Sequence, residues 1–303
     1  MAKAAVSDDD RDMKKGRFAP YGLLSPGVIW LVLFFVVPVV IMGKIALSTK
    51  PNPYEPIYNF TWQFSNFSHS VSDNLGLLGR SFWYAAVATV ISILIGYPLA
   101  YFIAFRGGKY RNLMLGLVVL PFYTSFLIRT LAWTSLLSDH GPFIDTLRGL
   151  HLLGVSNSIG MTQNGRLLNT AIAVIGGLTY NFVSFMILPI YVSLEKIDVR
   201  LLDAAQDLFS TPAEAFRKVV LPLSLPGVFA GTLLTFIPAA GDYINAQFLG
   251  GPNNSMIGSR VSDLFLKEAN YPEAAALSLI FMIVITVAVL IYARVLGTED
   301  LTG

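Results

Sequence analysis

Residues 23–47 read LLSPGVIWLVLFFVVPVVIMGKIAL, a run that contains a single charged side chain, Lys44. An α-helix rises about 1.5 Å per residue and the hydrocarbon core of a bilayer is about 30 Å thick, so about 20 apolar residues are enough to cross it. This run is longer than that, follows a polar tail, and has no small-residue cleavage site after it. It therefore predicts an uncleaved membrane-spanning helix rather than a signal peptide.

Five further apolar segments of similar length follow along the chain. They cover residues 81–105, 114–137, 168–191, 226–248 and 274–293. The composition agrees with this pattern, because 54% of the 303 residues are apolar and only 13% are charged, whereas a soluble domain carries about 25% charged residues. We therefore expect an all-α integral membrane protein with six transmembrane helices.

The loops between these segments predict the orientation of the chain. If the N-terminus is cytoplasmic, the segments on that side hold 13 Lys and Arg residues, and the segments on the other side hold six. Cytoplasmic loops are enriched in these residues, so both termini are expected in the cytoplasm. The chain then divides into a tail over residues 1–22, a membrane domain over residues 23–296 and a tail over residues 297–303.

Several classes of function lack support in the sequence. There is no GxxxxGK[ST] phosphate-binding loop, no HExxH metal motif and no GxSxG nucleophile motif. Cysteine is absent, which excludes disulfides and thiolate metal sites, and a net charge of +2 gives no electrostatic basis for a nucleic-acid partner. We therefore predict no catalytic, cofactor-binding or metal site in this chain, and the single acid within the predicted spans argues against a membrane-embedded enzyme.

The loop over residues 194–222 is the most charged stretch after the N-terminal tail, with nine charged side chains in 29 positions. It predicts two short helices, the first over residues 198–208. The second begins with Thr211 as the N-cap, Pro212 in the first turn and Glu214 completing a capping box, and it is expected to end at Leu221-Pro222. The loop is either a solvated connection or a docking element, and the defined caps favour docking.

One spacing in this loop carries a resemblance to a known family. Asp203-Ala204-Ala205, then Phe209 four positions later, then Val219-x-Leu221-Pro222 resembles the EAA loop of ABC importer permeases, Glu-Ala-Ala-x3-Gly-x9-Ile-x-Leu-Pro. Phe209 stands where the family has glycine, a residue that adopts positive φ without steric cost. Either the turn is strained at Phe209 or its geometry differs, and the ring is a candidate knob that packs into a partner.

The resemblance implies a type I ABC importer permease fold in a bacterial inner membrane. It also implies that the loop docks into an ATP-hydrolysing subunit, with Asp203, Ala204, Ala205, Phe209, Leu221 and Pro222 as the coupling residues. The implied partners are a second permease subunit, two ATP-binding subunits and an extracytoplasmic substrate-binding protein. ATP and Mg would be bound by the ATPase, not by this chain.

Two other stretches are similar to the polyamine (spermidine/putrescine) branch of that family. Residues 121–133 read PFYTSFLIRTLAW, and residues 241–258 contain Gly-Asp-Tyr followed by Leu-Gly-Gly-Pro. The resemblance implies import of a polyamine. An importer for another small solute, such as iron or an organophosphonate, is the main alternative, and an ATP-independent secondary transporter is a weaker one because no internal repeat is found.

Charges inside membrane spans are costly and invite a functional or pairing explanation. The predicted spans hold Lys44, Arg129 and Asp242. Asp242 is expected within the fifth helix, where it would either attract a cationic substrate together with Tyr243 and Trp133 or pair with Arg129. Asn181, in the middle of the fourth span, would either hydrogen-bond across helices or line the substrate path.

Overall fold

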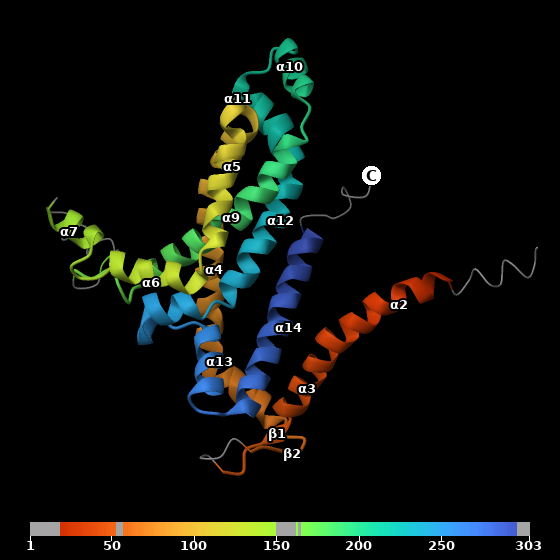
Figure 1. Ribbon diagram of the computed structural model, residues 1–303, viewed down its shortest axis with the longest axis vertical. Helices are drawn as coiled ribbons and strands as arrows, with labels where there is room; N and C mark the ends of the chain where they lie inside the picture. The colour runs from red at the N-terminus through yellow and green to blue at the C-terminus, as the bar shows by residue number, and fades with distance from the viewer. Residues whose placement is uncertain (1–18, 53–56, 150–161, 163–164, 296–303) are drawn as a thin grey trace, which may run out of the picture.

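The computed structural model describes residues 19–52, 57–149, 162 and 165–295, so most of the predicted N-terminal tail (1–22) and the C-terminal tail (297–303) lie outside the described residues. Figure 1 shows long helices that run side by side, with α10 at one end and the β1–β2 ribbon at the other. Five helices are long and apolar enough to cross a membrane, and a bent pair of helices forms a sixth candidate. The prediction of an all-helical membrane protein is confirmed.

Four of the predicted spans are confirmed as long helices. The first comprises α2 (Ala19–Leu31), the π-helical turn η1 (Val32–Val36) and α3 (Val37–Ala46). The others are α4 (Ser65–Arg106), α9 (Ala171–Glu195) and α14 (Tyr271–Val295). Helix α4 is 42 residues long, and it starts well before the predicted span because the polar stretch ahead of the apolar run is also helical.

The third predicted span, 114–137, is not one straight helix. The chain forms η2 (Gly108–Tyr110), α5 (Arg111–Val119) and η3 (Leu120–Tyr123), and then turns by 93° into α6 (Phe126–Leu136). Pro121 lacks an N–H group, and Thr124 and Ser125 have ψ values of 143° and 134°. These extended residues end the helical hydrogen bonding between the two halves.

The fifth predicted span also differs from the structure. Segments α11 (Pro212–Ala215), η4 (Phe216–Val220) and α12 (Leu221–Ala240) form one continuous helix, so the predicted stop at Leu221-Pro222 is wrong. The turn before Pro222 widens to a π-helix, in which the Leu221 N–H bonds to the Phe216 carbonyl. The helix ends at Ala240, not at residue 248, and Asp242 therefore lies beyond its end.

The remaining segments after α12 are short. They are η5 (Ala246–Gly250), η6 (Pro252–Asn254) and α13 (Ile257–Leu266). Gly258, in the first turn of α13, permits a close approach to the end of α12, because a Cβ atom there would lie 2.4 Å from the Gly241 carbonyl oxygen. The chain thus folds back on itself directly after the break at residues 241–243.

Helices α4, α9 and α12 pack together as the centre of the molecule (Figure 1). Small residues allow this approach, since a Cβ atom at Gly231 of α12 would lie 3.0 Å from the Met186 carbonyl oxygen of α9. Gly227 lies in the same way against the Pro189 carbonyl oxygen, at 2.5 Å. One buried cluster includes Tyr97, Ile190 and Leu194, and a second includes Val174, Leu178 and Leu249.

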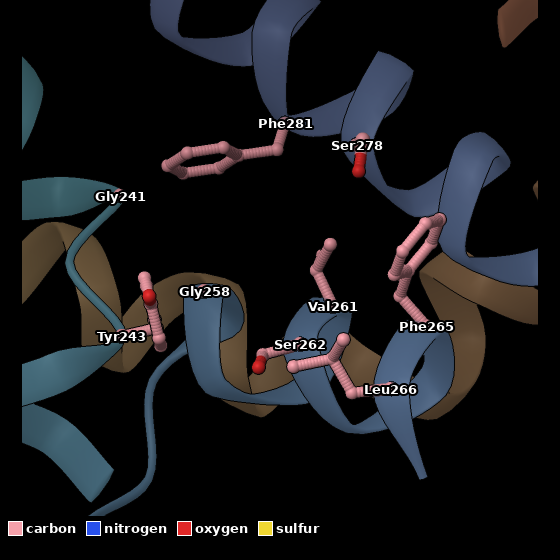
Figure 2. Close-up of a pocket in the computed structure, with 9 residues that line it drawn as sticks. All are labelled: Gly241, Tyr243, Gly258, Val261, Ser262, Phe265, Leu266, Ser278 and Phe281. Atoms are coloured by element: carbon pink, nitrogen blue, oxygen red, sulfur yellow. The ribbon is translucent and has the colours of Figure 1, made fainter. Parts of the chain in front are cut away.

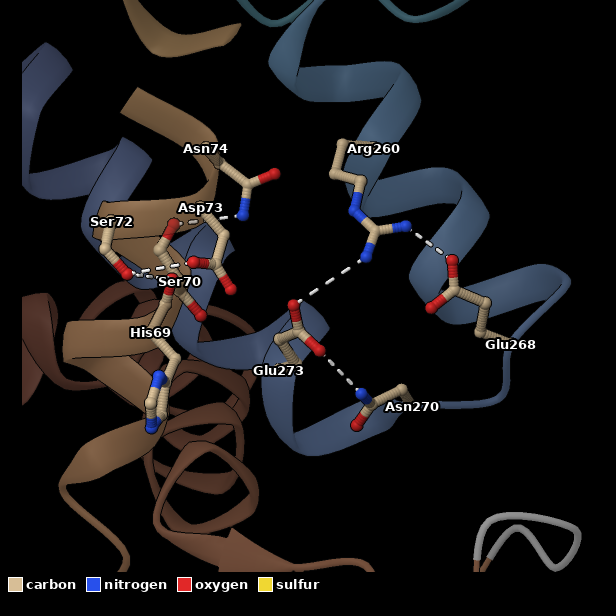
Figure 3. Close-up of polar contacts among 9 residues, drawn as sticks. All are labelled: His69, Ser70, Ser72, Asp73, Asn74, Arg260, Glu268, Asn270 and Glu273. Carbon is tan, nitrogen blue, oxygen red and sulfur yellow. Dashed lines mark hydrogen bonds and ion pairs between the residues drawn. The ribbon is translucent and has the colours of Figure 1, made fainter. Parts of the chain in front are cut away.

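The end of the molecule opposite α10 holds β1 (Ser48–Thr49) and β2 (Asn59–Phe60), which pair antiparallel with Ser48 opposite Phe60. Arg260 of α13 forms ion pairs with Glu268 and Glu273, the latter at 3.8 Å (Figure 3). Asn270 donates to Glu273 at 2.7 Å. These contacts fix the turn from α13 into α14.

Candidate functional site

The predicted docking loop forms a helical hairpin at one end of the molecule (Figure 1). Asp198 caps α10 (Val199–Asp207) by accepting a bond from the Arg200 N–H at 2.9 Å. Thr211 and Glu214 form the predicted capping box, with the Thr211 N–H donating to Glu214 at 2.9 Å and the Glu214 N–H donating to Thr211 Oγ1 at 3.3 Å. Both predicted helices are present, and the predicted capping box of Thr211 and Glu214 is confirmed. The second helix continues past its predicted end, and the cap by Asp198 is a feature that the sequence analysis did not predict.

Phe209 sits in the turn between these helices with a φ of +61°. Its N–H bonds to the Gln206 carbonyl at 2.8 Å, and the Ser210 N–H bonds to the Ala205 carbonyl at 3.0 Å. This pair of bonds is the Schellman arrangement that ends many helices, in which glycine is the usual residue at the left-handed position. The backbone at Phe209 therefore adopts the left-handed conformation that glycine usually adopts at this position. Of the two alternatives, a strained turn or a turn of different geometry, the structure shows the strained turn.

The side chains around this turn point into open space. Phe209 is 96% exposed and Leu208 is 79% exposed, and Asp203 and Ala204 are also exposed while Ala205 is partly covered. Leu221 and Pro222 lie instead within the long helix that leads away from the loop, and Leu221 packs against a buried cluster. The predicted coupling residues thus divide into an exposed surface and a supporting helix.

Two sets of contacts fasten this loop to the spanning helices, and the sequence did not point to them. Arg111 of α5 donates to the Tyr191 hydroxyl, forms an ion pair with Glu195 at the end of α9, and lies over the Tyr191 ring at 5.1 Å. On the other side, the Phe216 ring packs edge-on against Tyr97 of α4 at 5.8 Å between centroids. The ends of α4, α5 and α9 therefore meet next to the loop.

A buried polar cluster joins three segments in the middle of the molecule. Asn181 of α9 donates to Asn245 Oδ1 at 3.1 Å and to the Thr130 hydroxyl of α6 at 3.4 Å. Thr130 in turn donates to Asn245 Oδ1 at 3.3 Å, and all three residues are buried. Of the two alternatives for Asn181, the structure shows hydrogen bonding across helices, and it adds Thr130 and Asn245, which the sequence analysis missed.

Asp242 is also buried, at 8% exposure, and its carboxylate accepts a bond from the Asn245 N–H at 2.7 Å. It therefore caps the helical turn that carries Asn245. Within the described ranges no ion pair links it to Arg129. Arg129 lies over the Phe126 ring at 5.5 Å, so the predicted Asp242–Arg129 pair is not formed in this conformation.

The two aromatic candidates, Trp133 and Tyr243, have different neighbours. Trp133 packs against Tyr180 of α9 at 5.5 Å between centroids and stacks on Phe143 at 6.4 Å. Tyr243 instead forms one wall of a cavity of ≈ 380 Å³, opposite side chains of α13 and α14 (Figure 2). The cavity is lined by Gly241, Tyr243, Gly258, Val261, Ser262, Phe265, Leu266, Ser278 and Phe281. Trp133 and Tyr243 therefore do not form one aromatic wall. Asp242 and Asn181, by contrast, are connected because both hydrogen-bond to Asn245.

Comparisons with known proteins place this arrangement in context. Residues 93–297 match the family described as binding-protein-dependent transport system inner membrane component. The chain is 34% identical to the spermidine/putrescine transport system permease protein PotB of Haemophilus influenzae, over 88% of this chain and 90% of that protein. It is 33% identical to PotB of Escherichia coli K12, over 88% of this chain and 93% of that protein.

A solved structure shares the fold. It is a bacterial ABC transporter involved in the import of the acidic polysaccharide alginate, with a TM-score of 0.67 and 19% sequence identity over 98% of this chain and all of that chain. At this identity the likeness supports the architecture of the helices and not the substrate.

Proposed function

Because the chain belongs to the binding-protein-dependent transport system inner membrane component family, we propose that it forms half of the translocation path of an ATP-driven importer for polyamines. The chain is an ABC importer permease and a multi-pass protein of a bacterial inner membrane. The polyamine substrate is supported by the identity of 34% to a spermidine/putrescine permease across 88% of the chain.

The proposed orientation places α10 in the cytoplasm, as the distribution of Lys and Arg residues favours. There Leu208 and Phe209 present the apolar tip that docks on the ATP-binding subunits. ATP and Mg are bound by those subunits, and this chain contributes the movement of its helices rather than covalent chemistry. The proposed complex contains a second permease subunit, two ATP-binding subunits and an extracytoplasmic binding protein.

The first span supports the presence of a second permease subunit. Its most apolar stretch, within Leu23–Ala46, is not buried against the rest of the described chain, and α2 points away from the other helices (Figure 1). A second subunit that packs between this helix and α14 would cover both surfaces.

Within the path, Asp242 is the proposed contact for the amino groups of the substrate, with Asn181, Tyr243 and Trp133 on neighbouring segments. In the conformation described here, the Asp242 carboxylate is occupied by the Asn245 N–H. Two substitutions separate its possible roles. Asp242→Asn removes the charge but keeps a good N-cap, whereas Asp242→Ala removes both.

Uptake in a strain that lacks this chain tests the proposal. Complementation with the unchanged chain should restore accumulation of labelled putrescine or spermidine, and Asp242→Asn should abolish it while the complex still assembles. Restored accumulation of iron or an organophosphonate, with polyamine uptake unchanged by the deletion, would instead support the alternative solutes. If Asp242→Asn transports normally and Asp242→Ala does not, Asp242 acts as a cap and not as a substrate contact.

Docking is tested separately by capture of the ATPase. Lysine at positions 203, 205 and 209 together should prevent its retention, since charge would be placed on the exposed tip. A matched control carries lysine at Ser72, an exposed position on α4. Retention of the ATPase by the triple variant would contradict the docking role of this loop.

A further inference from the structure

Three aromatic side chains form an exposed row at the end of the molecule opposite α10. Phe60, Trp62 and Phe64, named here the aromatic ribbon, are 42%, 62% and 65% exposed. The Phe60 and Trp62 rings lie 4.9 Å apart, and the Trp62 and Phe64 rings are stacked at 6.2 Å. Because each ring contacts the next and all three are exposed, the ribbon is a continuous apolar surface.

The residues between these rings attach the ribbon to the end of the first span. The N–H groups of Thr61 and Gln63 both point to the Leu47 carbonyl, at 3.4 and 2.9 Å. Leu47 directly follows Ala46, the last residue of α3. Asn66 adds a bond from its side chain to the Ala46 carbonyl at 2.8 Å.

This attachment fixes the level of the ribbon relative to the first span. Since the backbone at Thr61 and Gln63 is bonded to Leu47, the rings at positions 60, 62 and 64 lie next to the end of α3. They do not project on a long loop away from it. Lys44, exposed in the last turn of α3, places a positive charge at the same end.

The backbone at Trp62 has a feature that bears on the same surface. Its φ is +55°, a left-handed conformation that is unfavourable for a large side chain. The bonds of Thr61 and Gln63 to the Leu47 carbonyl hold the residues on either side of Trp62, and they keep its ring between those of Phe60 and Phe64.

We propose that the aromatic ribbon is an anchor that lies in the phospholipid headgroup layer at this end of the molecule. Aromatic rings with a polar edge, above all the Trp indole, are enriched where one side of a side chain is apolar and the other is wet. Continuity with the end of a spanning helix selects the bilayer surface as the occupant. The nearby Lys44 ammonium is complementary to lipid phosphate. The ribbon thus fixes the height of the first span in the membrane, independently of which solute is transported.

Fluorescence of Trp62 in the assembled transporter tests this proposal. The three other tryptophans, Trp30, Trp83 and Trp133, are replaced with Phe, and the complex is reconstituted in vesicles of phosphatidylethanolamine and phosphatidylglycerol. Lipids brominated near the headgroup end of their acyl chains should strongly reduce the Trp62 emission, and aqueous iodide should reduce it only weakly. A chain that also carries Trp62→Phe gives the background signal.

Two results would overturn the proposal. Emission that iodide quenches strongly and brominated lipid does not would place Trp62 in water. Emission that becomes protected from iodide only when the binding protein is added would make the ribbon a surface for that protein. If the variant with one tryptophan does not assemble, the difference in emission between the unchanged chain and Trp62→Phe gives the same comparison.

Discussion

Replacing Phe209 with glycine should have opposite effects on the stability of the permease and on its docking. A left-handed conformation costs a non-glycine residue about 1–2 kcal/mol of folding free energy, and Phe209→Gly removes this cost. Glycine is more flexible in the unfolded chain, which offsets about 0.5–1 kcal/mol of the gain. With φ at +61°, Phe209→Gly should therefore stabilise the turn by about 0.5–1 kcal/mol. A gain of this size raises the melting temperature of a chain of this length by only about 1–3 °C.

The effect on docking is larger and has the other sign. The Phe209 ring is 96% exposed, so almost all of its surface is available for burial against the ATPase. Complete burial of a Phe side chain contributes about 1.5–3 kcal/mol, which corresponds to a loss of about 10- to 100-fold in affinity when the ring is removed. We expect Phe209→Gly to weaken binding of the ATPase to that extent.

Phe209→Ala is the matched control, because it removes the ring but keeps the unfavourable backbone conformation. Thermal unfolding of the purified permease in detergent should show a higher melting temperature for the glycine variant than for the alanine variant. Titration of immobilised permease with the ATPase should show that both variants bind equally weakly. A glycine variant that binds as tightly as the unchanged chain would show that the ring is not buried on docking. Equal melting temperatures for the two variants would show that the turn is not strained.

Three further outcomes follow from particular contacts. Gly177→Ala should destabilise the fold by about 1–3 kcal/mol, because a Cβ atom there would lie 2.4 Å from the Leu249 side chain of η5. Gly176→Ala is the control: a Cβ atom there meets open space, so this variant should be neutral or stabilising when both are compared by thermal unfolding. Arg111→Ala should lower the rate of substrate uptake without preventing assembly, because it removes the ion pair with Glu195. Arg111→Lys, which keeps the positive charge, should recover part of the lost uptake. An unchanged uptake rate in Arg111→Ala would contradict the role of this ion pair. Thr211→Ala should destabilise the loop by about 1 kcal/mol through loss of its cap, detected as faster local proteolysis.

The sequence predicted those features that depend on neighbouring residues. Apolar length sets the number of spans, and the capping box of Thr211 and Glu214 uses side chains within three residues of the bonds that they form. The positive φ at Phe209 was also open to prediction, because the spacing of the loop placed it where the helix must end. In each case the signal and the structure lie in the same few residues.

The two breaks in the spans could not be predicted in this way. Apolar residues resume after Thr124-Ser125 and after Asp242, so the overall hydrophobicity of each segment still predicts one long helix although polar residues stand at both breaks. Proline is equally ambiguous, since Pro121 precedes a break while Pro222 and Pro226 lie in a continuous helix. What decides these positions is packing with segments distant in sequence, such as the approach of α13 to the end of α12.

The polar cluster explains how the breaks are accommodated. Thr130 and Asn245 each follow a break by a few residues, and both hydrogen-bond to Asn181 on α9, which is unbroken. The halves of the third and fifth spans beyond their breaks are therefore tied to α9, and not only to the halves that precede them. Gly177 makes this possible, because a larger residue one turn before Asn181 would collide with Asn245.

At its other end, the same helix contacts the segments next to the docking loop. Tyr191 and Glu195 of α9 bind Arg111 of α5, and Ser184 donates to the Val118 carbonyl at 2.8 Å. Helix α9 thus holds α5 near the loop and α6 near the polar cluster through separate contacts, on either side of the 93° bend. If α10 docks on the ATP-binding subunits as proposed, we expect its displacement to change the angle between the halves of a broken span more readily than it could bend a continuous helix, in which successive backbone hydrogen bonds would have to break. On this proposal the two breaks transmit movement from α10 toward the buried residues around Asp242.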